Sequence, residues 1–327
     1  MAPEPDQPLS RDDLVAGILG TSAEFTAEQI AVEASVEVEV TRRLWRALGF
    51  PEYAEDEVAF TSHDMAALTL LQQTVDSGLI DFDTALNLTR AVGTTMARLA
   101  DWEVATLVPQ LPTGEGARDN RMAAALHMLE KVGEPFEQLL VYAWRRHLAA
   151  AASRIESLGP DDEELKTSDV TVGFADIVAF SALSNEIGEE RVGDLVEVFE
   201  TRCHDVVSTN HGRVIKSLGD SVLFICDDPV KALDIADGII TVIGRDSRMP
   251  DVRVGLASGG VVMRMGDVFG PPVNLAARLT AVARRNRMII DEATAARLPA
   301  DRFETRRLPA RPLRGFGLVE PISVRQR

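Results

Sequence analysis

Two aspartates in the second half of the sequence have the flanking pattern expected of metal ligands. Asp176 ends an apolar stretch in FADIVAFS (174–181), and Asp220 follows Gly219 in IKSLGDSVLF (215–224). Each could simply belong to a turn or cap. For Asp220 in particular, LGD is a favourable hairpin sequence. At the ends of neighbouring strands of one sheet, however, they would supply two hard oxygen ligands. Such a pair suits Mg²⁺ or Mn²⁺ bound together with a phosphate-bearing substrate.

A third block carries polar side chains of a different kind. In GDVFGPPVNLAARL (266–279), Pro271 and Pro272 favour the start of a helix. Asn274 and Arg278 then lie four residues apart, on one helical face. The pair could be no more than a solvated surface. An arginine in this position could also stabilise charge that develops on a phosphoryl group.

The elements that position these residues follow from the texture of the chain after residue 168. Apolar strands alternate with helices, and two strands flank the LGD turn, so the order is βαββαβ, the ferredoxin-like arrangement of an α+β domain. The predicted elements are a strand at 169–180, a helix at 187–208, two strands within 213–226, a helix at 229–244, strands at 251–258 and 261–265, a helix at 271–284, a strand at 287–290, a helix at 291–298 and a terminal strand pair.

Four blocks occur together in a fixed order: FADIVAFS, Lys216 with LGDSVLF, RVGLASG (253–259) and DVFGPPVNLAARL. In this order, residues 168–325 resemble the class III nucleotidyl cyclases. The resemblance implies that Asp176 and Asp220 bind two metal ions, Mg²⁺ or Mn²⁺, in each active site, and that the backbone carbonyl of Ile177 assists them.

The same resemblance assigns roles to two further pairs. Lys216 and Asp267 match the residues that recognise the purine, and Lys with Asp is the combination that selects adenine. Asp267 would accept a hydrogen bond from the adenine amino group, and Lys216 would donate one to a ring nitrogen. Asn274 and Arg278 match the residues that orient the ribose and stabilise the transition state.

Two more arginines match positions that contact phosphate: Arg253, and Arg314 in LRGFG (313–317).

The implied reaction is the conversion of ATP to 3′,5′-cyclic AMP and pyrophosphate. In the family the metal pair and the Asn/Arg pair face each other across a homodimer interface, so a chain that carries both sets would form two composite sites per dimer. The sequence contains no P-loop motif.

The first half of the chain has a different character. Residues 1–166 hold 29 Asp and Glu against 13 Lys and Arg, so almost all of the net charge of −17 lies there. The pattern predicts helices only, including separate helices at 118–132 and 134–158. Gly159, Pro160 and an acidic run then interrupt it. We therefore expect a helical regulatory or dimerisation domain at 1–158, a linker at 159–168 and a catalytic domain at 169–327.

Three interpretations of the helical half remain open. Residues 26–50 resemble a helix-turn-helix, so the chain could be a DNA-binding regulator with a nucleotide-sensing C-terminal domain; the acidic balance argues against this, although Arg42, Arg43 and Arg46 could form a small basic face. The segment 1–166 as a whole is similar to the regulatory domain of some actinobacterial adenylyl cyclases, which is associated with autoinhibition and with pH response. It could also serve dimerisation alone.

Histidine is the side chain whose charge changes most between pH 8 and pH 6. His127 and His147 lie in or beside the helix that leads to the catalytic domain, so they are the predicted pH sensors.

No apolar run is long enough for a membrane helix, and the N-terminus lacks the pattern of a signal peptide. With only two cysteines, Cys203 and Cys226, we expect a cytoplasmic protein without disulfides, bound to neither membrane nor nucleic acid.

Overall fold

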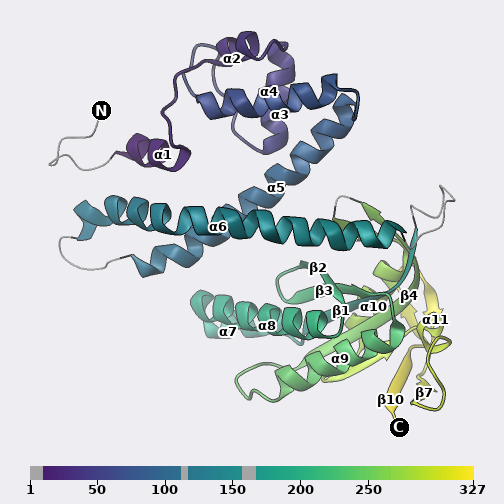
Figure 1. The fold of residues 1–327 in the computed structure, drawn as a ribbon. Coiled ribbons are helices and arrows are strands. Elements are labelled where there is room, and N and C mark those ends of the chain that lie inside the picture. Colours follow the sequence, from purple (N-terminus) through teal and green to yellow (C-terminus); the bar gives the residue numbers. More distant parts are fainter. Residues whose placement is uncertain (1–9, 112–116, 157–166, 265) are drawn as a thin grey trace. The chain divides into compact units, whose positions relative to one another are not determined.

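A computed structural model describes residues 10–111, 117–156, 167–264 and 266–327. The chain divides into two compact units, Met1–Ala151 and Ala152–Arg327 (Figure 1). Each is described by itself below. Within the described ranges, no helix has the length and apolar character needed to cross a membrane.

The described part of the first unit consists of helices joined by loops, with one isolated β-bridge between Phe25 and Phe60, so its helical character agrees with the sequence prediction. Its helices are α1 (Arg11–Leu19), α2 (Ala27–Glu33), α3 (Val38–Leu48), α4 (Ser62–Asp76), α5 (Phe82–Leu107), the short 3₁₀ helix η1 (Val108–Gln110) and α6 (Ala117–Glu156). The side chains of Ser10, Thr26 and Thr61 form capping boxes at the starts of α1, α2 and α4. A small core of aromatic and aliphatic side chains, including Ile30, Trp45 and Phe60, holds α2, α3 and the following segment together.

Helix α6 corrects one detail of the predicted pattern. It is a single helix of 40 residues that contains Pro135, where the sequence predicted two helices separated at residue 133. A proline inside a helix removes one backbone hydrogen bond, but the flanking residues are mostly strong helix formers. The predicted linker at 159–168 lies largely outside the described residues.

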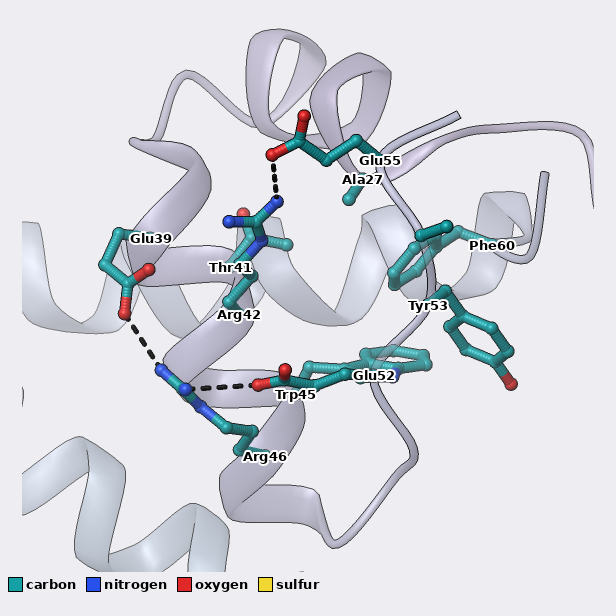
Figure 2. Close-up of a pocket in the computed structure, with 11 residues that line it drawn as sticks. Ala27, Glu39, Thr41, Arg42, Trp45, Arg46, Glu52, Tyr53, Glu55 and Phe60 are labelled. Atoms are coloured by element: carbon teal, nitrogen blue, oxygen red, sulfur yellow. Dashed lines mark hydrogen bonds and ion pairs between the residues drawn. The ribbon is translucent and has the colours of Figure 1, made fainter. Parts of the chain in front are cut away.

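The α2–α3 segment does form two helices joined by a short turn, but its arginines are not free to contact phosphates. Arg42 pairs with Glu55 at 3.0 Å, and Arg46 pairs with both Glu39 and Glu52 (Figure 2). Arg43 lies 3.7 Å from Asp83. Each positive charge on α3 is thus matched by a carboxylate, so the surface does not favour the DNA-binding alternative.

The second unit is an α+β domain built on a mixed sheet with the strand order β2-β3-β1-β4-β6-β10-β7. Strand β1 lies antiparallel to β3 and to β4, which confirms the predicted ferredoxin-like arrangement. The elements are β1 (Ser168–Ile177), α7 (Phe180–Ile187), α8 (Glu189–Thr209), β2 (Arg213–Ser217), β3 (Ser221–Cys226), α9 (Pro229–Gly244), β4 (Val252–Arg264), β5 (Asp267–Phe269), α10 (Pro271–Val282), β6 (Arg287–Ile290), α11 (Glu292–Ala295), β7 (Phe303–Arg307), β8 (Arg311–Leu313), β9 (Gly317–Val319) and β10 (Ile322–Gln326).

Helix α7 and the number of strands after α11 differ from the sequence prediction, and so do two strand boundaries near the predicted site. Strand β1 ends at Ile177, because Ala179 adopts a left-handed backbone conformation (φ 57°) and α7 begins directly afterwards. Strand β4 is one strand of 13 residues, where the sequence predicted two. Its pairing with β1 continues through Gly259 and Gly260, so the glycines do not break it.

Alternate side chains of the central strands face two separate cores. Ala175, Phe224 and Leu256 point to one face, where α8 and α9 lie side by side (Figure 1). Val172 and Leu223 point to the other face, which α10 covers. Because side chains alternate along a strand, Asp176 and Arg253 lie on the α10 side of the sheet.

Helix α10 is held unusually close to β4. A Cβ atom at Gly255 would lie 2.4 Å from the backbone nitrogen of Thr280, so only glycine allows this approach. The hydroxyl of Thr280 also donates to the carbonyl oxygen of Phe174 on β1, at 3.2 Å. These contacts fix α10, and with it Asn274 and Arg278, relative to the end of β1.

Candidate active site

Asp176 is the penultimate residue of β1 and is held from both sides. Its neighbours in the sheet are Ser221 on β3 and Arg253 on β4. The Ser221 hydroxyl donates to Oδ1 at 2.7 Å, and the Arg253 Nε donates to Oδ2 at 2.7 Å. The carboxylate is therefore fixed in orientation before any ligand binds.

Asp220 occupies the turn between β2 and β3, directly beside the end of β1. Its backbone carbonyl accepts a hydrogen bond from the Ile177 N–H at 3.0 Å. Burial raises the pKa of the Asp220 carboxyl, and the negative charge of Asp176 raises this pKa further. Gly219 supplies the positive φ of 66° that this turn requires.

These surroundings fit the metal ions that the sequence predicts. The two carboxylates lie close enough to repel each other, so a cation between them would stabilise both charges. The Ile177 side chain is buried in the core, which leaves its backbone carbonyl as the group that could serve as a ligand. Among the described residues no group of three or more His, Cys, Asp or Glu side chains is placed to hold a metal ion.

Lys216 and Asp267 meet as the resemblance implies. Lys216 Nζ donates to Asp267 Oδ2, and the Val268 N–H donates to Oδ1 at 2.8 Å. Burial raises the pKa of the Asp267 carboxyl. Hydrogen bonds from the Lys216 ammonium and the Val268 N–H nevertheless hold this pKa below its ordinary value. The Asp267 side chain is therefore a carboxylate at neutral pH.

A bulge in β2 determines where Lys216 lies. Val214 pairs with Phe224, whereas Lys216 pairs with Leu223, so the register shifts by one residue between them. Without this shift Lys216 would lie opposite Val222, on the α8 and α9 side. The bulge brings Lys216 to the face of the sheet that α10 covers.

Asn274 and Arg278 lie on the exposed face of α10. The opposite face, which includes Pro272, Ala276 and Leu279, is buried against the sheet. Neither Asn274 nor Arg278 has a side-chain partner within the part of the chain that the structure describes. Both are available to a ligand or to a second chain.

The two remaining candidates lie in different surroundings. Arg253 donates to Asp176 and, through Nη1, to the carbonyl oxygen of Ala281 at 2.9 Å, so in this structure it links β1 to the end of α10. Arg314 is exposed in the turn between β8 and β9, a separate two-stranded sheet. No described contact brings Arg314 to the two aspartates. Sequence reasoning missed Ser221; its place directly after Asp220, on the α10 side of β3, was the available signal.

Comparison with known proteins agrees with this geometry. The family model "Adenylate and Guanylate cyclase catalytic domain" matches residues 163–321. An adenylate cyclase of Streptomyces coelicolor is 37% identical over 95% of this chain and 88% of its own length. The chain belongs to the class III adenylate cyclases. An adenylate cyclase of Streptomyces griseus is 35% identical over 98% of this cyclase and 90% of its own length.

A more distant relative has a name that refers to pH. A protein of Mycobacterium tuberculosis named pH-sensitive adenylate cyclase is 27% identical over 92% of this cyclase and 78% of its own length. These alignments include the helical half, so the relatives share more than the catalytic domain. The family and enzyme class expected from the sequence are confirmed, whereas the roles of individual site residues remain predictions.

We predict that Asp220→Asn raises the melting temperature of the metal-free protein by about 1–3 °C at pH 8, because it removes a charge that burial and Asp176 disfavour. A carboxyl with a raised folded-state pKa loses stability as the pH rises through that pKa, so the gain should disappear towards pH 4. Thermal melts in EDTA between pH 4 and pH 8 measure this.

The matched control is Asp301→Asn, which removes an exposed carboxylate in a turn and should leave the melting temperature unchanged. Added Mn²⁺ should stabilise the wild type and the control, but not Asp220→Asn. A variant that melts below the wild type in EDTA at pH 8 and is still stabilised by Mn²⁺ would contradict this account of the site.

Proposed function

We propose that this cyclase converts ATP to 3′,5′-cyclic AMP and pyrophosphate at composite sites in a homodimer, with two Mg²⁺ or Mn²⁺ ions per site. The observation that carries the proposal is the convergence of Asp176 and Asp220 at neighbouring strand ends, on the sheet face that also bears the Lys216–Asp267 pair. Carboxylate oxygens bind the metals that accompany nucleotide phosphates. A charged Lys–Asp pair matches the hydrogen-bonding edge of adenine.

The purine pair retains the capacity to bind a base. Lys216 uses one of its three N–H donors on Asp267, and two remain. The Asp267 carboxylate accepts from Lys216 and Val268 and has further lone pairs for an exocyclic amino group. Guanine presents the opposite arrangement of donor and acceptor, so the pair favours ATP over GTP.

The arrangement on α10 supports a composite site. Asn274 and Arg278 have no side-chain partner among the described residues of their own chain. A twofold dimer would bring them opposite the aspartates of the partner and would form two equivalent sites. Each subunit would then contribute the metal ligands to one site and the helix α10 residues to the other.

The proposed reaction joins the ribose 3′ oxygen to the α-phosphorus and breaks the bond to pyrophosphate. When bound, two metal ions would activate the 3′ hydroxyl and neutralise the leaving oxygens. Asp176, oriented by Ser221, and Asp220 would hold these ions through their carboxylates. Arg278 would donate to the phosphoryl oxygens as their charge develops, and Asn274 would orient the ribose for attack.

Complementation between two inactive variants tests the composite site. Asp176→Ala and Arg278→Ala should each be inactive alone, but a mixed dimer places both lesions in one site and leaves the other intact. Random exchange of subunits should restore about a quarter of wild-type cyclic AMP formation, because half of the dimers are mixed and each retains one of two sites.

The matched control mixes Asp176→Ala with Asp220→Ala. Both substitutions affect the metal-binding half of a site. Each site of a mixed dimer therefore contains one of the two substitutions, and no activity should return. If verified exchange between Asp176→Ala and Arg278→Ala restores nothing, the composite-site proposal is wrong.

We also propose that the helical half, taken as 1–158, restrains the catalytic half at mildly alkaline pH and releases it towards pH 6. The pH-sensitive mycobacterial relative supports this proposal. His127 and His147 are both exposed on α6, and His127 lies 3.9 Å from Glu130. Histidine is the type of side chain whose charge changes most between pH 8 and pH 6. Gly159 and Pro160, in the linker that the sequence predicts, lie outside the described residues.

Comparison of the full-length protein with a 160–327 fragment tests the restraint. At pH 8 the fragment should form cyclic AMP faster than the full-length protein, by up to about a hundredfold if the restraint displaces the half-sites by ångströms. Near pH 6 the two rates should converge. Profiles of equal shape and height between pH 5.5 and pH 8.5 would instead leave dimerisation as the role of the helical half.

A further inference from the structure

A basic groove of about 690 Å³ lies in the catalytic unit and is lined by none of the residues assigned above. Strand β10 pairs with β6 only through Ile322 and Ser323, and then continues alongside β7. The start of β6 and the end of β10 therefore have no pairing with each other. The groove lies at this opening of the sheet, with α9 and the segment after α10 as further walls.

The lining of the groove has a marked excess of positive charge. Two of its residues are acidic, Asp237 and Glu304, and five are arginines, so the excess is three positive charges: Arg284, Arg287, Arg306, Arg311 and Arg325. This excess occurs in a chain whose net charge is −17. A concave surface lined by one sign of charge concentrates the potential that attracts an oppositely charged ligand.

The groove arginines differ from their neighbours in having no ion pair among the described residues. Arg307, adjacent to Arg306, pairs with Glu292 and Glu320. Arg285, adjacent to Arg284, lies 3.6 Å from Asp251. Only Arg325 has an acidic neighbour in the sheet, because it lies opposite Glu304 in the β7–β10 register. Five guanidinium groups without an ion pair among the described residues thus line one concave region.

We propose that this groove binds a small ligand that carries two or more phosphate groups. Guanidinium groups match phosphate oxygens with paired hydrogen bonds, and several arginines around one cavity favour a polyvalent anion. The volume lies in the range of small-molecule sites. Aliphatic side chains also line the groove and would contact a non-phosphate portion of the ligand: Ile240, Val282, Met288, Leu308 and Val324.

The groove lies at the same end of strands β4 and β6 as the candidate active site, but the two contain different residues. Arg287 lies beside Arg253 in the parallel β4–β6 register, whereas the Arg253 side chain is held by Asp176 and Ala281. Arg287 therefore belongs to the groove and Arg253 to the site of the proposed reaction. The inference does not depend on the ATP chemistry proposed above.

Titration calorimetry with inorganic tripolyphosphate tests the proposal on the full-length protein. The buffer contains EDTA, because without metal the two active-site aspartates repel a polyphosphate. The groove variant combines Arg287→Gln with Arg306→Gln and should bind at least about tenfold more weakly than the wild type. The control combines Arg191→Gln with Arg245→Gln, two exposed arginines that also lack ion pairs among the described residues and do not line the groove.

The control removes the same net charge as the groove variant, but from outside the groove. It should therefore bind within about twofold of the wild type. Arg278→Ala should likewise bind as the wild type does, which separates this site from the proposed active site. ADP in place of tripolyphosphate should show the same loss in the groove variant. Equal affinity of wild type and groove variant, or no binding by the wild type, would overturn the proposal. A groove-dependent attraction that appears only with anionic phospholipid vesicles would also overturn it, in favour of a membrane surface.

Discussion

The electrostatic repulsion between two neighbouring carboxylates is the constraint on which the catalytic unit depends. Asp176 and Asp220 are brought together by the β1–β3 pairing, and both partial burial and the charge of Asp176 raise the pKa of Asp220. The fold opposes this repulsion with Arg253 and Ser221, which bind the Asp176 carboxylate before any metal does. A cation bound between these carboxylates, as proposed, would recover the stability lost here.

Arg253 connects this electrostatic arrangement to the position of α10. The same guanidinium that binds Asp176 also donates to Ala281 near the end of α10, while Gly255 and Thr280 hold the helix against β4. The carboxylates and the exposed face of α10 that bears Asn274 and Arg278 are therefore held in one rigid arrangement. Reaction geometry of this kind depends on groups held by packing and not by loops alone.

Much of this could be predicted from the sequence, because motifs report residue types and local order. The ferredoxin-like order, the two aspartates and the Lys216–Asp267 pair all follow from short blocks of sequence. Register and side-chain contacts do not, because they depend on the strand that lies alongside. The bulge that redirects Lys216 and the engagement of Arg253 by Asp176 both depend on such partners. Helix α6 likewise continues through Pro135, where a local rule predicts a break.

The central claim is that the two aspartates form the metal site of an ATP cyclase. Cyclic AMP formation from ATP by the purified full-length protein, measured with Mg²⁺ and with Mn²⁺ for the wild type and Asp176→Ala, tests it most directly. The account predicts metal-dependent product from the wild type and a loss of about a thousandfold or more in the variant. Undiminished turnover by Asp176→Ala with both metals would contradict it.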